Sequence, residues 1–181
     1  MSIHIERLRA VSAADLEGLA QVLVDCVARG ASVSFMAPLS LDQARAWWSG
    51  IAAEVARGDR ILLVARDGAG CVGTVQLVVA QPPNQPHRAD LAKMLVHGRA
   101  RRQGVGAALL QAAEAQALQA GRPLLVLDTA SPEAERLYER GGWQRCGFIP
   151  NYALLPDGRY CGTRLYFKQL AETLPAWPPQ A

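Results

Sequence analysis

Lysine is almost absent from this 181-residue chain. Lys93 and Lys168 are the only two, so nearly all of the positive charge comes from arginine. The formal net charge is +3, and the cations are dispersed along the chain. A charge this weak suits an anionic small molecule and does not indicate a nucleic-acid surface. We therefore expect no nucleic acid among the partners.

Cysteine is scarce as well, and its spacing argues against two common scaffolds. The four cysteines are far apart and form no C-x-x-C pair: Cys26, Cys71, Cys146 and Cys161. This spacing supports neither a zinc site nor a disulfide framework. We expect no metal and a reducing environment.

Long apolar runs are also missing. No run approaches the roughly 20 residues that a membrane span needs. Residues 1–7 are charged and alternate between apolar and polar positions, unlike a signal peptide. We therefore predict a soluble, cytoplasmic protein that does not engage a membrane.

The overall composition is that of a globular protein, with 50% hydrophobic and 19% charged residues. A chain of this length can bury one substantial core. We predict a single domain over residues 1–171. Residues 172–181 contain Pro175, Pro178 and Pro179 and are predicted to form a loose C-terminal tail.

Hydrophobic periodicity, with serines before and glycines after the apolar stretches, predicts the element order β-α-α-β-β-β-α-β-α-β-β. The predicted strands cover residues 3–9, 60–66, 71–80, 90–96, 122–128, 144–154 and 160–170. The predicted helices cover residues 13–29, 40–58, 107–120 and 131–141. A helix between strands 90–96 and 122–128 implies that these two strands pair in parallel. The fold class is therefore α/β, with a mixed sheet of about seven strands.

The stretch from Asp90 to Ala120 is the most informative part of the chain. It reads as a strand, a short basic turn and an alanine-rich helix. Arg101 lies three residues before Gly104 and five before Gly106, where the helix begins. A helix start exposes unpaired N–H groups and a positive dipole end, and glycines let a ligand approach closely. The pattern favours a phosphate or pyrophosphate site; the alternative is an ordinary turn whose glycines only relieve strain.

Two common phosphate motifs do not fit this turn. A Rossmann motif would need a glycine at Leu109, and a P-loop would need Gly-Lys-Ser/Thr, which is absent. Arg101-x-x-Gly104-x-Gly106 after an apolar strand instead resembles the coenzyme A pyrophosphate arm of the GNAT N-acetyltransferases. Further parts agree at family-like spacing, and together they cover about residues 60–170: Met94-Leu95-Val96, Ala134-x-x-Leu137-Tyr138-Glu-Arg-x-Gly142-Trp143 and Asp157-Gly158…Tyr166-Phe-Lys168-x-Leu170.

The resemblance implies a GNAT fold: a mixed, mostly antiparallel sheet with a central, splayed parallel pair and about four flanking helices. It also implies direct transfer of an acetyl group from acetyl-CoA to a primary amine. A narrower likeness, to the subgroup of the tabtoxin-resistance acetyltransferases, implies a small toxin or antibiotic as the acceptor. It is carried by residues 30–37, Ala46-Trp47, 127–129 and 156–159. A peptide amine as acceptor, a non-catalytic acyl-CoA-binding module and a homodimer remain open.

For the cofactor, the resemblance implies two sets of contacts. The strand backbone at Met94, Leu95 and Val96 would pair with pantetheine and polarise the thioester carbonyl. The arm would hold the pyrophosphate with Arg101, Arg102, Gln103, Gly104, Val105, Gly106 and Ala107. Ser131 stands where the family often has an asparagine that contacts the pantetheine or its thiol, although it could serve only as a helix cap.

Three residues are candidates for the chemistry. Strict alternation would put Asp90 on the same face as Met94, which makes Asp90 a candidate base. The alternative is an exposed carboxylate at a strand end. Asp128 ends the neighbouring strand and could serve as base, as amine anchor or as a helix-start cap with Thr129. The family role of Tyr138 is to protonate the departing thiolate, and the alternative for this residue is core packing.

The acceptor site is expected on the side of the two early helices. Phe35, Met36 and Trp47 are predicted to line it, and only one of Trp47 and Trp48 should reach the pocket, because aromatic residues at helical spacing are more often core. The final hairpin could close the opposite wall.

Overall fold

The computed structural model describes residues 3–171, so the predicted tail over 172–181 lies outside the described residues. The strands are β1 (His4–Leu8), β2 (Arg60–Asp67), β3 (Gly70–Val78), β4 (Arg88–Val96), β5 (Leu124–Thr129), β6 (Gln144–Leu154) and β7 (Tyr160–Gln169). The helices are α1 (Ala13–Ala28), α2 (Leu41–Arg57), α3 (Val105–Gln119) and α4 (Pro132–Arg140), with a short 3₁₀ helix η1 (Gly98–Ala100). The predicted order of strands and α-helices is confirmed.

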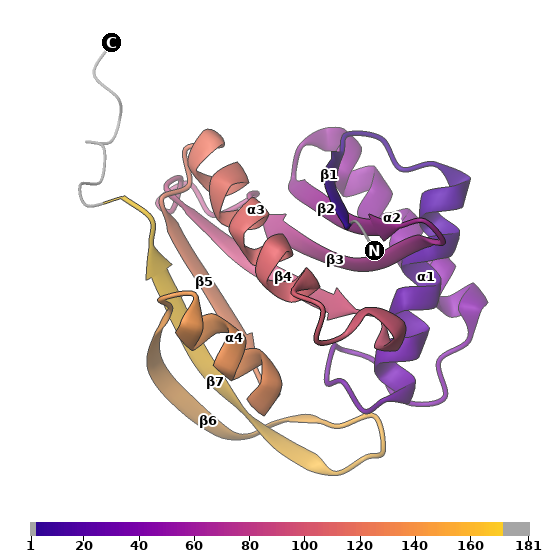
Figure 1. The fold of residues 1–181 in the computed structure, drawn as a ribbon. Coiled ribbons are helices and arrows are strands. Elements are labelled where there is room, and N and C mark those ends of the chain that lie inside the picture. The colour runs from indigo at the N-terminus through magenta and orange to yellow at the C-terminus, as the bar shows by residue number, and fades with distance from the viewer. Residues whose placement is uncertain (1–2, 172–181) are drawn as a thin grey trace.

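The seven strands form one mixed sheet in the order β1-β2-β3-β4-β5-β7-β6 (Figure 1). Its one parallel pair is β4–β5, and the remaining described pairs are antiparallel. The strand–helix–strand unit that contains α3 accounts for this pairing, because a crossover helix returns the chain in the same direction. The predicted fold class is confirmed.

Local sequence determines where the first two helices begin and where the second ends. Ser12 and Ser40 each accept a hydrogen bond from the backbone N–H three residues later, and Asp15 and Gln43 complete two capping boxes. Gly58 ends α2 in the left-handed conformation, with φ of 81°. These serines and this glycine are the signals from which the boundaries were predicted.

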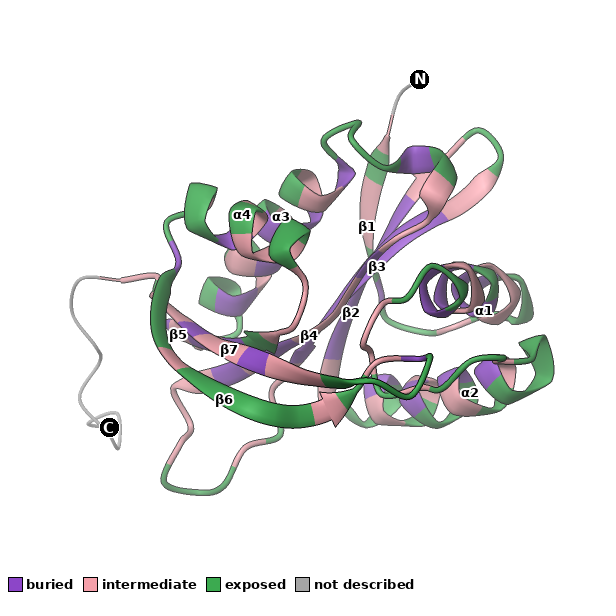
Figure 2. Ribbon diagram, turned by 90° about the horizontal axis from the view of Figure 1, so that it is seen from below, coloured by how far each residue is buried: buried purple, intermediate pink, exposed green. Residues whose placement is uncertain are grey.

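The sheet separates two apolar clusters, which place helices on both of its faces (Figure 2). On one face, α3 and α4 contribute Leu109 and Tyr138 to the first cluster. On the other face, α1 and α2 contribute Leu23 and Trp48 to the second. No helix within residues 3–171 is both long enough and apolar enough to cross a membrane.

The parallel pair β4–β5 is joined over only a short length. Backbone pairing runs from Arg88–Leu124 to Asp90–Val126 and then ends, although both strands continue. Beyond this point the strands diverge toward the start of α3 on one side and the start of α4 on the other (Figure 1). The predicted splay is confirmed, and it leaves the β5-facing edge of β4 without a strand partner near Met94.

A bulge interrupts β4 just before this opening. Gln76 of β3 pairs with Ala92, and Thr74 pairs with Leu95, so β4 has one extra residue between these pairs. Lys93 takes up the irregularity with φ of 51°. The prediction of strict alternation along this strand is therefore wrong, because the extra residue reverses the faces of all the side chains that follow it.

Candidate active site

The basic turn after β4 forms an exposed arm that leads into α3. Arg101, Arg102, Gln103 and Gly104 are exposed, whereas Val105 is buried in the core and anchors the first turn of the helix. Arg101 is tied back to the strand, because its Nε donates a hydrogen bond of 3.2 Å to the carbonyl oxygen of Val96. The arm therefore has a fixed base and presents its remaining polar groups outward.

The start of α3 differs from the other described α-helix starts. Serines cap α1, α2 and α4, but Gly104 precedes α3 and supplies no side-chain cap. Gly104 has φ of 80°, a left-handed conformation that a glycine adopts without strain. The N–H groups of the first turn are left for a ligand, and the dipole adds positive potential at this point. This fits an anionic group, as the sequence predicted.

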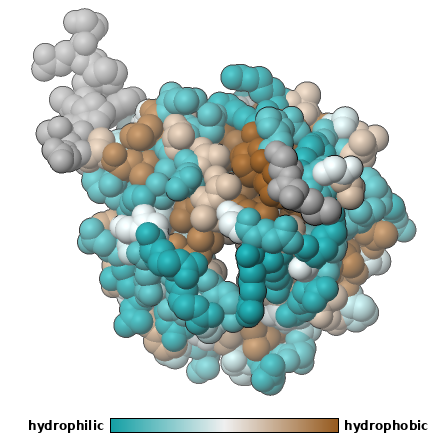
Figure 3. Space-filling model, viewed as in Figure 1, coloured by the Kyte–Doolittle hydropathy of each residue, from teal (hydrophilic) through white to brown (hydrophobic). Residues whose placement is uncertain are grey.

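Gly106 allows α3 to lie close to α4. A Cβ atom built at this position would lie 3.2 Å from Cδ2 of Leu137, closer than most such contacts in proteins. Ala107 and Leu137 also line a cavity of about 290 Å³ between the two helices, near the arm. The space-filling view shows the surface hollowed between α4 and the arm, where the ribbons of β4 and β5 part (Figure 3).

Asp128 lies at the end of β5, on the other side of this opening. It is exposed, and one carboxylate oxygen accepts a hydrogen bond of 2.7 Å from Oγ1 of Thr163 on β7. Thr163 is almost fully buried, so it holds the carboxylate in a defined orientation. The second oxygen of Asp128 has no hydrogen-bond donor among the described residues, which leaves it able to accept a proton or to bind an ammonium group.

Tyr138 is buried beside Asp128, within the cluster under α4. Its ring lies 5.6 Å from that of Trp143 and 6.1 Å from that of Tyr166, measured between centroids. Burial, and to a lesser degree the charge of Asp128, raise the pKa of the phenol well above its usual value near 10. Its hydroxyl has no hydrogen-bond partner within residues 3–171. The ring is thus part of the core, and the raised pKa means that the hydroxyl stays protonated and is a weaker acid than a free phenol.

Asp90 is the last residue of β4 that pairs with β5, at the point where the two strands begin to part. It is level with Val126, two residues before Asp128 on β5. One oxygen accepts hydrogen bonds from Gln81 at 2.9 Å and from Arg88 at 3.3 Å. Asp90 is therefore a paired carboxylate, and its role as a base stays a prediction.

The predicted face of Asp90 requires a correction. Met94 and Val96 pack against the cluster under α3, whereas the buried Leu95 belongs to the cluster under α1 and α2. Leu91, next to Asp90, packs under α3 as well. Asp90 therefore points to the face opposite that of Met94, and the bulge at Lys93 is the reason.

Of the three predicted acceptor residues, two are in contact with each other. The rings of Phe35 and Trp47 meet edge to face, with centroids 5.5 Å apart. Trp48 is fully buried, so of these two tryptophans only Trp47 has an exposed part. Met36 is 47% exposed and projects into solvent.

The loop between α1 and α2 is bonded to the tip of the final hairpin. Oγ of Ser32 donates to the carbonyl oxygen of Leu154 at 3.4 Å, and the N–H of Ala37 donates to that of Pro156 at 3.0 Å. These two segments lie side by side at the end of the molecule where β4 and β5 diverge (Figures 1 and 2). Together they form a roof over the acceptor side; we use this name for residues 30–38 together with 154–160.

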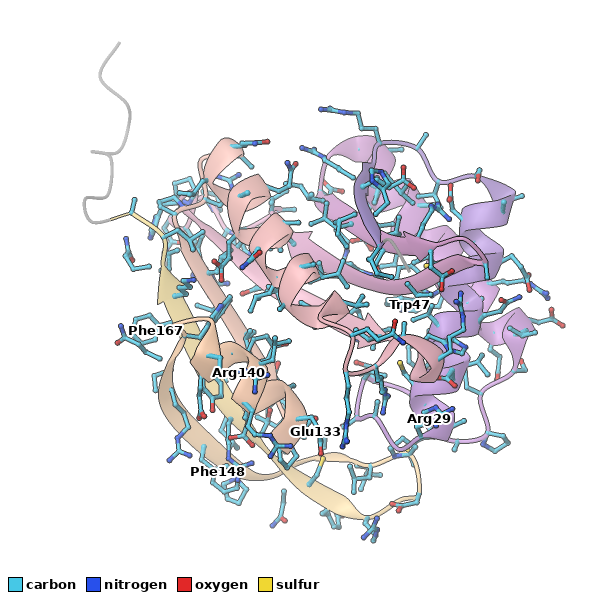
Figure 4. All side chains as sticks on the ribbon, in the orientation of Figure 1. Arg29, Trp47, Glu133, Arg140, Phe148 and Phe167 are labelled. Atoms are coloured by element: carbon cyan, nitrogen blue, oxygen red, sulfur yellow. The ribbon has the colours of Figure 1, made fainter. Side chains whose placement is uncertain are left out.

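Ser131 begins α4 as a helix cap. Its hydroxyl oxygen accepts a hydrogen bond of 3.3 Å from the N–H of Ala134 and its hydroxyl donates one of 3.1 Å to Glu133. Glu133 lies at the edge of the opening (Figure 4). Hydrogen bonds from its own backbone N–H and from Ser131 lower the pKa of its carboxyl group, and the charge of Arg101 lowers it further. The alternative that was left open for Ser131, helix capping, is what its hydrogen bonds show.

Two residues of this region were missed from the sequence. Thr163 holds Asp128 from a strand that is distant in sequence, and nothing local marks it. Lys93 was not among the predicted site residues, and it approaches Trp47 and Ser34 on the acceptor side. The rarity of lysine in this arginine-rich chain was the one signal in the sequence that could have drawn attention to Lys93. Within residues 3–171, no group of three His, Cys, Asp or Glu side chains could hold a metal ion.

Comparison with known proteins agrees with this architecture. A family model described as "Acetyltransferase (GNAT) domain" matches residues 58–145, which run from the end of α2 to the start of β6. This range contains the splayed pair, the arm and Tyr138.

Solved structures extend the agreement to the rest of the chain. An N-acetyltransferase from Staphylococcus aureus Mu50 is 20% identical with a TM-score of 0.78, covering 94% of this chain and all of its own. The yncA protein of Salmonella typhimurium, solved with its cofactor acetyl-CoA, is 18% identical with a TM-score of 0.79 and full coverage of both chains. A phosphinothricin acetyltransferase from Sinorhizobium meliloti, in complex with acetyl-CoA, is 19% identical with a TM-score of 0.76, covering 99% of this chain and 98% of its own.

The protein therefore has the fold of the GNAT acetyltransferases. The matched family model covers just under half of the chain and is consistent with this fold.

Proposed function

We propose that this protein is an acetyl-CoA-dependent N-acetyltransferase whose acceptor is a small molecule with a primary amine. The observation that carries this proposal is the uncapped start of α3 beside the point where β4 and β5 part. A helix start of this kind attracts a diphosphate, and an unpaired strand edge attracts a chain of amides such as pantetheine.

The residues at the opening fit coenzyme A. The N–H groups of residues 104–107 would bind the diphosphate, with Arg101 and Arg102 adding charge-assisted contacts. The backbone of Met94, Leu95 and Val96 would pair with pantetheine. When bound, acetyl-CoA supplies an acetyl thioester that needs little activation. The family position of Ser131 adds a candidate contact, which its capping hydrogen bond makes weaker.

Residues of the chain have to carry out two proton transfers, one from the acceptor amine and one to the departing thiolate. Asp128 is the stronger candidate for the base, because one of its oxygens has no donor among the described residues and the other is held by Thr163. Tyr138 is the candidate acid, because its hydroxyl is protonated and has no hydrogen-bond partner within the described residues. Asp90 remains the alternative base, at the cost of breaking its bonds to Gln81 and Arg88.

The roof favours a small acceptor over a peptide. It joins both walls of the acceptor side by hydrogen bonds, which shortens the space available to an extended chain. The likeness to the tabtoxin-resistance subgroup and the phosphinothricin acetyltransferase among the similar structures both suggest an amino-bearing toxin or antibiotic. We therefore include such molecules in the acceptor class, with peptides as the competing class.

A thiol-release assay with acetyl-CoA and a panel of amines tests the proposal. The panel should contain amino-acid-like toxins, aminoglycosides, polyamines and short peptides. We expect release of coenzyme A with at least one small amine, together with acetylation of that amine detected by mass spectrometry. Binding of acetyl-CoA without turnover on any amine would favour a non-catalytic acyl-CoA-binding module, and no binding of acetyl-CoA would end the proposal.

A further inference from the structure

Lys93 carries a charge that the proposed chemistry does not use. It lies at the bulge of β4, in a left-handed conformation that turns its side chain toward α2. Its Nζ donates a hydrogen bond of 3.0 Å to Oγ of Ser34 and lies 5.5 Å from the centroid of the Trp47 ring. Three separate segments, β4, the loop before α2 and α2 itself, thus converge on one ammonium group.

This ammonium has no counter-ion close to it. Among the described residues, no carboxylate forms a salt bridge with Lys93; its partners are a hydroxyl group and an aromatic ring. Lys168, the other lysine, shows the usual arrangement: its Nζ lies 2.7 Å from Glu114 and 2.7 Å from the carbonyl oxygen of Gly141. A half-buried cation is costly without an anion, so the surroundings of Lys93 suit a ligand that brings one.

The nearby charges are already engaged or lie on the opposite side. Burial lowers the pKa of Lys93, and the charge of Arg60 lowers it further. Arg60 is itself bonded to Glu54 and Gln76. The charge of Asp128 acts in the other direction and favours the charged form of Lys93. Among the described residues, the acceptor side therefore has an ammonium group without an ion-pair partner, that of Lys93 on β4. It also has a carboxylate with one unbonded oxygen, that of Asp128 on β5.

We infer that Lys93 is an anion subsite for the acceptor, and that the preferred acceptor carries a carboxylate near its reactive amine. This inference rests on the proposed function. Asp128 would receive the amine side of the molecule, and Lys93 and Ser34 its carboxylate. Trp47 would then cover the apolar part of the molecule.

The competing explanation is structural. Lys93 could serve only to hold the loop at Ser34 in place. In that case its removal would weaken every acceptor equally or lower stability, whereas an anion subsite affects only acceptors that carry a carboxylate. The test therefore needs matched acceptors as well as matched variants.

The first part of the test compares α-amino acids with their carboxamides on the wild-type protein. The two sets keep the same side chain and differ in the carboxylate. Because the carboxamide also lowers the pKa of the amine, kcat/KM is calculated on the concentration of neutral amine. We expect at least a tenfold higher kcat/KM for the acids, because a charge-assisted hydrogen bond is lost in the amides. Equal values for both sets would overturn the inference.

The second part uses Lys93→Met, Lys93→Arg and, as a control, Arg57→Met. Lys93→Met keeps the length and the apolar stem but removes the charge, and we expect about a tenfold to hundredfold rise in KM for the acids. The KM for the amides and for acetyl-CoA should stay within about twofold. Lys93→Arg should recover part of the loss. Arg57→Met removes an exposed cation from the end of α2 and should change nothing.

Calorimetric binding of the same acids and amides separates this inference from the proposed function. Tighter binding of the acids that is lost in Lys93→Met supports the subsite even when no amine is acetylated. Turnover with no preference for acids, or an equal loss for acids and amides in Lys93→Met, contradicts the subsite and leaves the acetyltransferase assignment intact.

Discussion

The two strands of the splayed pair lead into helices that begin in opposite ways. After β4, an exposed basic arm ends at Gly104, and α3 starts with no side-chain cap. After β5, a short link ends at Ser131, which caps α4, and Pro132 and Glu133 complete the first turn. The first helix start is positive and open, and the second is internally satisfied and carries an acid.

Under the proposed function, this difference gives the two halves of the opening different tasks. The half formed by β4, the arm and α3 has free backbone N–H groups and arginines, which suit a diphosphate. The half formed by β5 and α4 has Asp128 and Tyr138, which suit proton transfer. Because Ser131 caps the start of α4 and the start of α3 has no side-chain cap, an anion is expected to bind in the first half. Variants in the two halves should therefore separate binding from turnover.

The largest effect is expected in the half that moves protons. Replacing Asp128 with Asn keeps the shape of the side chain but removes its ability to accept a proton. We expect kcat to fall by about 10²–10³-fold, with the Kd for acetyl-CoA unchanged. Asp90→Asn is the matched variant on the neighbouring strand and should cost less than about tenfold. A larger loss in Asp90→Asn than in Asp128→Asn would move the base to β4.

The next largest effect is expected at the open helix start. Val in place of Gly104 must adopt a φ of 80°, and its side chain would cover the N–H groups of α3. We expect the Kd for acetyl-CoA, measured by calorimetry, to rise by at least about a hundredfold.

Gly121 provides a control at the other end of α3. It has φ of 68°, and a Cβ atom there would meet no other atom within 4 Å, as at Gly104. Gly121→Val should therefore lose similar stability and bind acetyl-CoA normally. Equal weakening of binding in both variants would show that Gly104 acts through stability and not through the cofactor.

A smaller effect is expected at Tyr138. The Phe variant keeps the ring packing against Trp143 and removes a hydroxyl that makes no hydrogen bond within the described residues, so stability should change little. We expect kcat to fall by about ten- to a hundredfold, with no change in the Kd for acetyl-CoA. Because burial raises the pKa, the phenol keeps its proton between about pH 6 and 9, and the loss should be constant across that window. Wild-type turnover in this variant would remove the acid role.

Much of the fold could be predicted because its signals are local. Ser12 and Ser40 mark helix starts, Gly58 marks a helix end, and the alternation within single strands marks the sheet. The parallel pairing of β4 with β5 follows from one intervening helix. The arm could be located for the same reason, since Arg101, Gly104 and the helix start lie within a few residues of one another.

The faces of β4 could not be predicted in this way. The bulge at Lys93 arises from how β4 pairs with β3, and no residue type in the strand signals it. One extra residue moved Met94 away from the face of Asp90 and brought Lys93 onto the acceptor side. Thr163 was missed for a similar reason, because its contact with Asp128 spans 35 residues. Contacts between strands determined the details of the site.

The smallest effect is expected at Ser131, and it tests the contrast between the two helix starts most directly. Ser131→Ala removes the cap of α4, so the free energy of unfolding should fall by about 1 kcal/mol, measured by urea denaturation. The Kd for acetyl-CoA should stay within about twofold, because the hydroxyl is already bonded to Ala134 and Glu133. Ser131→Asn can restore the cap and serves as the control for stability. If the alanine variant kept full stability but bound acetyl-CoA tenfold more weakly, the start of α4 would belong to the cofactor site, and the division into a binding half and a reacting half would have to be abandoned.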